Sequence, residues 1–387
     1  MATITRFIIS TFDYQLDGLA VDEFSNTVFK KGSSVTRRGI TVTVEDSEGA
    51  RGRFVNIDND TATTAQTIAI AKLLVGRDVD TREQMYDDVK RIQRKIGAFG
   101  YPNLDIALWD LAGQRAGMPI WKLLGGYRKS LPAYVSTFHG DRNGGLSSKE
   151  AFADYAQWSL EQGFKGFKIH GWSAGDRREE AENVLHVAER VGGRMDLMLD
   201  PACELKTFGD ALYVGRACDE GNYFWYEDPF RDGGFSRHAH KKLRQMIKTP
   251  ILMGEHIRGL EAKADTITTE ATDFVRVNPT LDMGITGTMK IAHLAEAHGL
   301  DVEYHGCGPS QRQCMAATRN ANYYELTLCA PGIGNPKPPI YTCGYSESPE
   351  AIDANGHVPV SDLPGIGVSY DWDFIARNTA DTVTVSA

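Results

Sequence analysis

The chain has 387 residues, 42% hydrophobic and 24% charged, which is ordinary globular usage and argues against a disordered or membrane-embedded class. The net charge of -9, without a Lys/Arg-rich stripe, predicts no nucleic-acid partner. Six cysteines without CxxC spacing, no signal-peptide pattern at the start and no apolar run of membrane length predict a reduced, cytoplasmic protein with no membrane partner.

The first 130 residues have the pattern of a small α+β domain. Residues 4–10 and 40–53 alternate apolar and polar side chains, which predicts strands of an antiparallel sheet. Residues 81–97 and 103–118 then carry apolar side chains at helical intervals and include glycines near their ends. We therefore expect a separate domain over residues 1–130.

From residue 131 the pattern changes to short apolar runs that recur every 20 to 35 residues, with amphipathic helical segments between them. The eight runs lie near residues 133, 166, 196, 223, 250, 273, 300 and 322. Eight strand–helix units predict a (β/α) barrel, a modified TIM barrel, over residues 131–345. A doubly wound sheet is the alternative, but its Gly-rich phosphate turn is missing after the first run. The loop-rich segment 346–387 is expected to pack back on the first domain and complete it.

Polar side chains gather at the ends of these runs, where barrel enzymes place their active sites. In chain order they are Lys168, His170, Asp200, Glu227, Glu255, Asn278, His305 and Glu325. A single carboxylate here could be a helix cap or a solvated strand end. Three carboxylates in successive units would repel each other unless a cation held them, and an all-oxygen set suits Mg²⁺. The second and seventh strands lie across the barrel mouth from each other, which places bases on both sides of this predicted metal.

Several motifs resemble the enolase superfamily, and within it the mandelate racemase subgroup. They are LDIALWDLAGQRAGMPIWKLLGG (104–126), FKIH (167–170), LMLD (197–200), WYEDP (225–229), MGE (253–255), GITGTMKIAHLAEAHGLDVEYH (284–305) and DLPGIGV (362–368). The resemblance covers nearly the whole chain, in the order and spacing of the family. It implies a capping domain over the barrel, and assembly into homo-oligomers by analogy.

The resemblance also implies roles for individual residues. Asp200, Glu227 and Glu255 would bind Mg²⁺, and Lys168 would lie beside the carboxylate of a small-molecule substrate. His305 would act as base or acid on one face, and Glu325 would hydrogen-bond the substrate carboxylate. The shared step of the family is removal of the proton α to a carboxylate, giving an enolate held by the metal.

Two positions depart from the family pattern. His170 replaces the second lysine of a K-x-K motif, and Asn278 replaces an aspartate that normally pairs with the histidine. An Asn carbonyl could accept from the His305 ring, but it supplies no charge to stabilise an imidazolium. A weaker base at His305 favours β-elimination of water over racemisation, which needs two competent bases. The pattern does not decide whether His170 or Lys168 is the base, and Asp273 or Asp282 could replace Asn278 if the strand register differs.

Substrate specificity is expected to come from the first domain. Residues 15–26 and 33–39 are candidate lid loops, in which Arg37 or Arg38 could bind a second carboxylate or several hydroxyls, although each arginine alone is more often a solvated loop charge. The leading prediction is a Mg²⁺-dependent dehydratase of an aldonic or aldaric acid. A racemase, epimerase or cycloisomerase is the alternative, and a non-catalytic metal–carboxylate sensor is the remote one.

Overall fold

The computed structural model describes residues 1–97, 99–173, 175–333 and 337–386. Its first domain contains a four-stranded antiparallel sheet with the order β13-β1-β2-β3. The strands are β1 (Ile4–Val21), β2 (Thr27–Asp46), β3 (Arg51–Asn56) and β13 (Thr379–Ser386). Alternate residues of β1, including Phe7 and Ile9, are buried, as the period-two pattern predicts. The helices of this domain are α1 (Thr61–Leu74), α2 (Arg82–Ile96), α3 (Tyr101–Ala116) and α4 (Ile120–Leu123).

The second domain is the predicted barrel, and all eight expected strands are present. They are β4 (Ser130–Thr137), β5 (Gly166–His170), β6 (Asp196–Asp200), β7 (Trp225–Glu227), β8 (Ile251–Met253), β9 (Phe274–Val277), β10 (Asp301–Tyr304) and β11 (Tyr324–Cys329). Neighbouring strands pair in parallel along the path from β10 to β4 and on to β11. The two ends of this path, β10 and β11, are also in contact.

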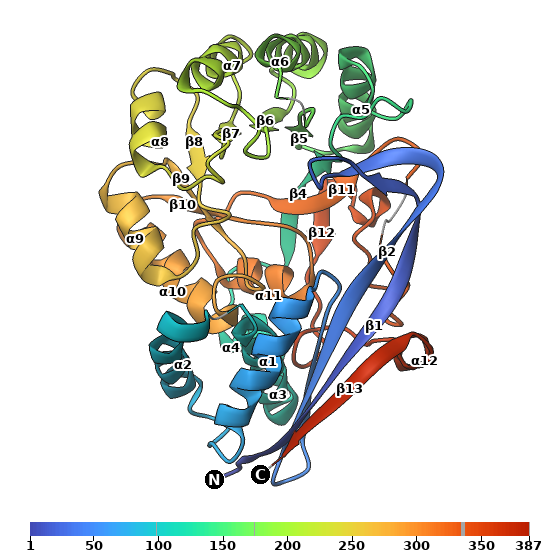
Figure 1. The fold of residues 1–387 in the computed structure, drawn as a ribbon, viewed down its shortest axis with the longest axis vertical. Helices are drawn as coiled ribbons and strands as arrows, with labels where there is room; N and C mark the ends of the chain where they lie inside the picture. The colour runs from blue at the N-terminus through green and yellow to red at the C-terminus, as the bar shows by residue number, and fades with distance from the viewer. Residues whose placement is uncertain (98, 174, 334–336, 387) are drawn as a thin grey trace.

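Seven helices alternate with these strands and surround them (Figure 1). They are α5 (Lys149–Gln162), α6 (Arg177–Val191), α7 (Phe208–Glu220), α8 (Arg237–Arg244), α9 (Leu260–Thr268), α10 (Gly284–Ala297) and α11 (Pro309–Ala317). Because the eight strands from β4 to β11 are parallel, their carboxyl ends meet at one mouth.

The end of the chain joins the two domains. A short helix η1 (Pro349–Ala351) precedes β12 (His357–Pro359), which pairs antiparallel with β4 of the barrel. The chain then crosses to the first domain through α12 (Trp372–Arg377), and β13 pairs antiparallel with β1. The C-terminal segment therefore completes the capping domain, as expected, but only after it has added a strand to the barrel.

The expected lid loops are strands instead. Residues 15–21 belong to β1 and residues 33–39 to β2, and the two strands pair almost to the turn between them. This hairpin extends beyond the sheet as a ribbon with much of its surface exposed (Figure 1). Its residues are therefore polar, and this polar composition led to the prediction of loops. Its tip reaches the barrel, where Asn26 Nδ2 donates to Ser173 Oγ at 2.9 Å. The hairpin thus covers part of the barrel mouth as paired strands.

Candidate active site

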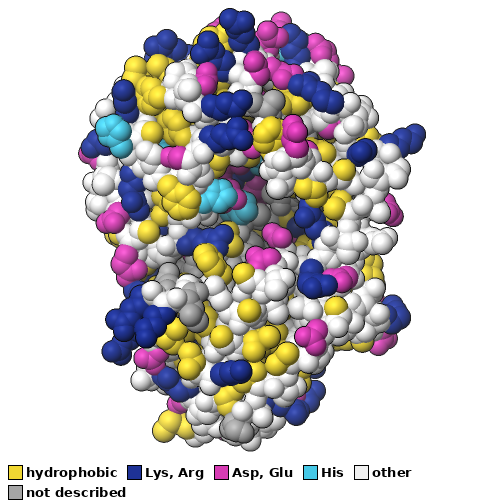
Figure 2. Space-filling view, in the orientation of Figure 1, with side chains coloured by type: hydrophobic (Ala, Val, Ile, Leu, Met, Phe, Trp, Pro, Cys, Tyr) yellow, Lys and Arg dark blue, Asp and Glu magenta, His cyan; other side chains and the backbone are white. Residues whose placement is uncertain are grey.

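Three carboxylates converge at the mouth of the barrel. Asp200 and Glu227 are the last residues of β6 and β7, and Glu255 follows β8 by two residues. One oxygen from each lies within 4.8 Å of the other two. Figure 2 shows histidine and acidic side chains together in a hollow of this face. The structure therefore brings together the three residues expected to bind a metal, which we call the carboxylate cluster.

The backbone after β8 is built to turn Glu255 toward the mouth. Gly254 has φ of 118°, in the region that favours glycine. The N–H groups of Gly254 and Glu255 both donate to the carboxylate of Asp228, at 3.2 Å and 3.1 Å to Oδ2. Asp228 therefore fixes the turn that carries the third member of the cluster.

Two buried cations hold the carboxylates from inside the barrel. Lys168 Nζ lies 3.2 Å from Asp200 Oδ2, 3.0 Å from Glu227 Oε2 and 2.9 Å from Glu325 Oε1. Arg276 on β9 places Nε 2.6 Å from Glu227 Oε1 and Nη2 3.3 Å from Glu325 Oε2. Burial and Arg276 lower the pKa of Lys168, but Glu227 and Glu325 outweigh them and raise it well above its usual value. Its contacts with three carboxylates therefore favour the ammonium form of Lys168.

The charges of this network do not balance among themselves. The cluster and Glu325 carry four negative charges when ionised, and Lys168 and Arg276 supply two positive charges, which leaves -2. Burial raises the pKa of Glu227 to about 7 even though two cations touch it. A divalent cation on the cluster would cancel the excess and keep Glu227 ionised. The oxygen donors and the net charge thus fit Mg²⁺.

His170 faces the cluster through its Nε2 atom. Its Nδ1 lies 2.7 Å from the carbonyl oxygen of Thr137, and because a carbonyl only accepts, Nδ1 must carry the hydrogen. Nε2 lies 3.1 Å from Asp200 Oδ2, so the protonated ring donates to this carboxylate. In the neutral ring the lone pair is on Nε2, which becomes an acceptor once a cation takes that oxygen of Asp200. The buried ring of His139 packs against His170 with centroids 4.9 Å apart.

His305 presents the opposite tautomer. Asn278 Oδ1 already accepts from Thr280 N and Oγ1, both at 2.8 Å, and from Gln311 Nε2 at 3.3 Å. Its Nδ2 is left to donate to His305 Nδ1 at 2.9 Å, so Nδ1 is an acceptor and Nε2 carries the hydrogen. The Asn278 carbonyl, which the sequence offered as an acceptor for the ring, accepts from these other donors instead.

The electrostatics of His305 also favour its neutral form. Burial lowers the pKa of His305, against the charge of Glu255, whose Oε1 lies 3.2 Å from Nε2. The two alternative partners are engaged elsewhere. Asp273 pairs with Arg244 at 2.7 Å, and Asp282 accepts from the backbone N–H of Asn278 at 2.9 Å. The predicted register of this strand, which selects Asn278, is therefore correct.

The two arginines expected to bind substrate lie on the hairpin, away from the contacts just described. Arg38 forms two hydrogen bonds with Asp13, at 2.7 Å and 2.8 Å, and both side chains are exposed. Arg37 Nη2 donates to Thr27 Oγ1 at 2.5 Å. In the described part of the chain, neither arginine contacts the carboxylate cluster.

Sequence reasoning missed Arg276 and His139. Arg276 stands two residues before Asn278 in the run DFVRVN, so the alternation of a strand puts both side chains on one face. A charged side chain in a short apolar strand was the same signal that singled out Lys168. His139 follows β4 in a polar segment, where only the tertiary structure brings it to His170.

Family models match both parts of the chain. Residues 27–125 match the N-terminal domain of mandelate racemase / muconate lactonizing enzyme, and residues 151–374 match the enolase C-terminal domain-like family. The chain belongs to the mandelate racemase group of the enolase superfamily. It is thus an enzyme of that superfamily, and the resemblance read from its motifs is confirmed.

Named relatives share between a quarter and a third of their residues with this chain. A 3,6-anhydro-alpha-L-galactonate cycloisomerase of Streptomyces coelicolor is 28% identical over 87% of this chain and 90% of its own length. An arabinonate dehydratase of Saccharolobus solfataricus is 28% identical over 76% of this chain and 77% of its own. The crystal structure of D-glucarate dehydratase from Agrobacterium tumefaciens, complexed with magnesium, is 28% identical, covers 98% of this chain and 99% of its own, and superposes with a TM-score of 0.87.

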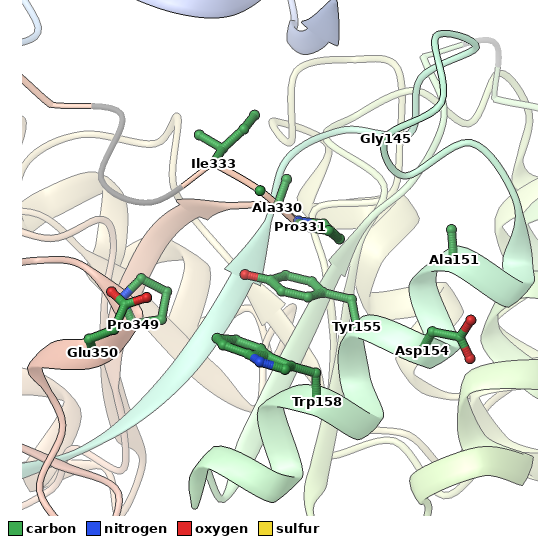
Figure 3. A pocket seen from close by; sticks show the side chains of 11 residues that line it. Gly145, Ala151, Asp154, Tyr155, Trp158, Ala330, Pro331, Ile333, Pro349 and Glu350 are labelled. Carbon is green, nitrogen blue, oxygen red and sulfur yellow. The ribbon is translucent and has the colours of Figure 1, made fainter. Parts of the chain in front are cut away.

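A cavity lies apart from the carboxylate cluster. It has a volume of about 690 Å³ and lies between α5 and the segment after β11 (Figure 3). Tyr155 and Trp158 stack along it with centroids 5.3 Å apart. None of the cluster residues lines it.

Among the described residues, no helix is both long and apolar enough to cross a membrane.

Proposed function

We propose that this chain is a Mg²⁺-dependent dehydratase of a hydroxylated carboxylic acid of the sugar-acid class. The observation that carries the proposal is the opposite hydrogen bonding of the two Nδ1 atoms beside the carboxylate cluster, where that of His170 donates and that of His305 accepts. One neutral ring offers a lone pair and the other offers an N–H. Elimination of water needs this asymmetry, because one group takes a proton and another gives one. The names of the relatives, among them arabinonate dehydratase and D-glucarate dehydratase, support the same class.

The substrate carboxylate would bind between the metal and the fixed charges of the barrel. Asp200, Glu227 and Glu255 would hold Mg²⁺, which supplies a Lewis acid that stabilises negative charge developing on the substrate. Lys168 stays protonated, so it contributes charge rather than acting as a base. Glu325 positions Lys168 through their 2.9 Å contact. Despite burial, Lys168 and Arg276 hold the pKa of Glu325 well below its usual value, so its carboxylate could accept only from a hydroxyl of the substrate.

The proton is taken on the side of His170. We assign the base to its Nε2, because Lys168 is held as an ammonium and His305 has its hydrogen on Nε2. The α-proton goes to His170 and the C–O bond to the β-hydroxyl breaks. His305 gives its Nε2 hydrogen to the departing hydroxide, and water leaves. The ring is then an imidazolate, because Nδ1 carries no hydrogen, and it recovers a proton when the imidazolium of His170 releases the one it took. The enol product rearranges to a 2-keto-3-deoxy acid.

Cycloisomerisation is the second candidate, because one relative with that name covers 87% of this chain. It would use the same base, with a ring ether oxygen in place of the hydroxyl as the leaving group. Racemisation fits less well, since it requires both histidines to exchange roles. Assembly as a homo-oligomer and a cytoplasmic location stay predictions.

Incubation with Mg²⁺ and a panel of sugar acids in D₂O tests the proposal. A dehydratase releases a 2-keto-3-deoxy acid, whereas an epimerase incorporates deuterium at the α-carbon without loss of water. His170→Asn should abolish both product formation and α-proton exchange. His305→Asn should retain exchange at the α-carbon and lose elimination. If His170→Asn still exchanges the α-proton, His170 is not the base, and if no acid reacts, the proposal fails.

A further inference from the structure

A second pocket opens beside the carboxylate cluster, and its role is not assigned by the chemistry above. It has a volume of about 480 Å³ and lies between Gly97 and Phe99 of the capping domain and the loops that follow β7, β8 and β9. Its lining includes Phe99, Phe235, His256 and Arg258. His256 Nε2 lies 3.9 Å from Glu255 Oε1, so this imidazole borders both the pocket and the cluster. A substrate that binds at the cluster and reaches past His256 would enter this pocket.

Arg258 is the charged group of this pocket, and it lacks a counter-ion. Among the described residues it forms no hydrogen bond or ion pair, and its guanidinium carbon lies 4.5 Å from the centroid of the Phe99 ring. The nearby acid Asp282 is occupied, since it accepts from the backbone N–H groups of Gly259 and Asn278. In contrast, the buried Arg276 touches two carboxylates.

The surroundings of Arg258 strengthen any ion pair it makes. Burial lowers the pKa of Arg258, although the distant charges of Asp282 and Glu255 oppose this effect. Phe99 and Phe235 expose 45% and 57% of their surface, so the pocket has apolar walls. An anion held against a guanidinium between such walls is less hydrated and more tightly bound than on an open surface. A planar guanidinium fork matches the two oxygens of a carboxylate.

We propose that Arg258 binds the carboxylate at the far end of the substrate, so that the chain acts on aldaric acids in preference to aldonic acids. This inference rests on the proposed function, because it assumes that the first carboxylate binds at the cluster. It assigns the second carboxylate to the barrel rim rather than to the hairpin, where Arg38 is already paired with Asp13. Arg258 would thus determine substrate class and take no part in the proton transfers.

The test compares an aldonic acid with the aldaric acid of the same configuration, which differ only at the terminal carbon. The wild-type chain should have kcat/KM about 10- to 100-fold higher for the aldaric acid, the size expected for one charge-assisted, bidentate contact. Arg258→Met should remove that preference and change kcat/KM for the aldonic acid less than about 3-fold. Arg258→Lys should keep part of the preference. Arg177→Met, which removes an exposed, aromatic-stacked arginine on α6, is the matched control and should change neither value.

A binding measurement separates recognition from turnover. In the inactive His170→Asn background with Mg²⁺, calorimetric titration should show about 10- to 100-fold weaker binding of the aldaric acid after Arg258→Met is added. Thermal unfolding of each variant checks that it is folded. The inference is overturned if dehydration of aldaric acids survives Arg258→Met unchanged, if both acids lose activity equally, or if a terminally phosphorylated aldonic acid is preferred. Failure of the wild type to dehydrate any acid would instead overturn the proposed function.

Discussion

The Asn278→Asp substitution tests the assignment of the two histidines most directly. In the wild type, the Asn278 amide donates to His305 Nδ1 across 2.9 Å, and this contact opposes protonation of the ring. An aspartate can keep one oxygen on Thr280 and Gln311 while the other oxygen accepts from Nδ1. The ring would then carry a hydrogen on Nδ1, and its imidazolium would gain a negative partner.

The expected size of this change follows from the contact. A hydrogen bond to a charged group contributes about 1.5 to 3 kcal/mol, which corresponds to about 1 to 2 pKa units. Burial lowers the pKa of His305 in the wild type, and the variant should move it upward by that amount. His305 Nε2 then becomes a competent base in its neutral form. The variant should therefore exchange the α-proton from both faces and epimerise substrate at the expense of elimination.

The assay is the pH dependence of kcat/KM together with nitrogen NMR of the histidine tautomers. The limb assigned to His305 should shift to higher pH, and its Nδ1 signal should change from acceptor to donor. Asn355→Asp adds the same charge at an exposed turn and should leave both readouts unchanged. An unshifted limb with an unchanged tautomer would refute the role given to Asn278.

Three further predictions concern the metal and the stability of the fold. Chelation with EDTA should abolish activity and lower the melting temperature, and added Mg²⁺ should restore both in a concentration-dependent way, because the cation offsets the net charge of the cluster. Arg276→Met should reduce the free energy of unfolding in urea by about 3 to 5 kcal/mol, because it leaves the buried carboxylates of Glu227 and Glu325 short of positive charge. As a control, Arg244→Met removes a partly exposed ion pair and should reduce it by less than about 1 kcal/mol. Asp105 is fully buried, and burial raises its pKa from 3.8 to about 6. The folded state binds this proton more tightly than the unfolded state, so ionisation of Asp105 lowers the free energy of unfolding as pH rises from about 4 through about 6. In urea titrations, the free energy of unfolding of Asp105→Asn should therefore gain about 2 to 3 kcal/mol relative to the wild type between pH 4 and pH 7. A difference that does not change with pH would contradict this.

Much of the barrel was predictable because each strand is short, apolar and followed by a polar residue that faces the mouth. Asp200, Glu227 and Glu255 could be selected for this reason, and so could the pair Lys168 and His170. The hairpin was not predictable in the same way. Its strands extend past the sheet into solvent, so residues 15–26 and 33–39 have the composition of loops.

The sequence by itself determined which residue types stand at the strand ends, because chain order and the period of a strand are local properties. It therefore determined the fold class and the candidate metal ligands. Only the tertiary structure decided which atom of each side chain faces which partner. The tautomers of His170 and His305 depend on the Thr137 carbonyl and on a fully occupied Asn278 carbonyl, and both contacts join separate strands. The isolation of Arg258 is likewise a property of the assembled pocket, because a missing partner can be recognised only when all neighbouring elements are in place.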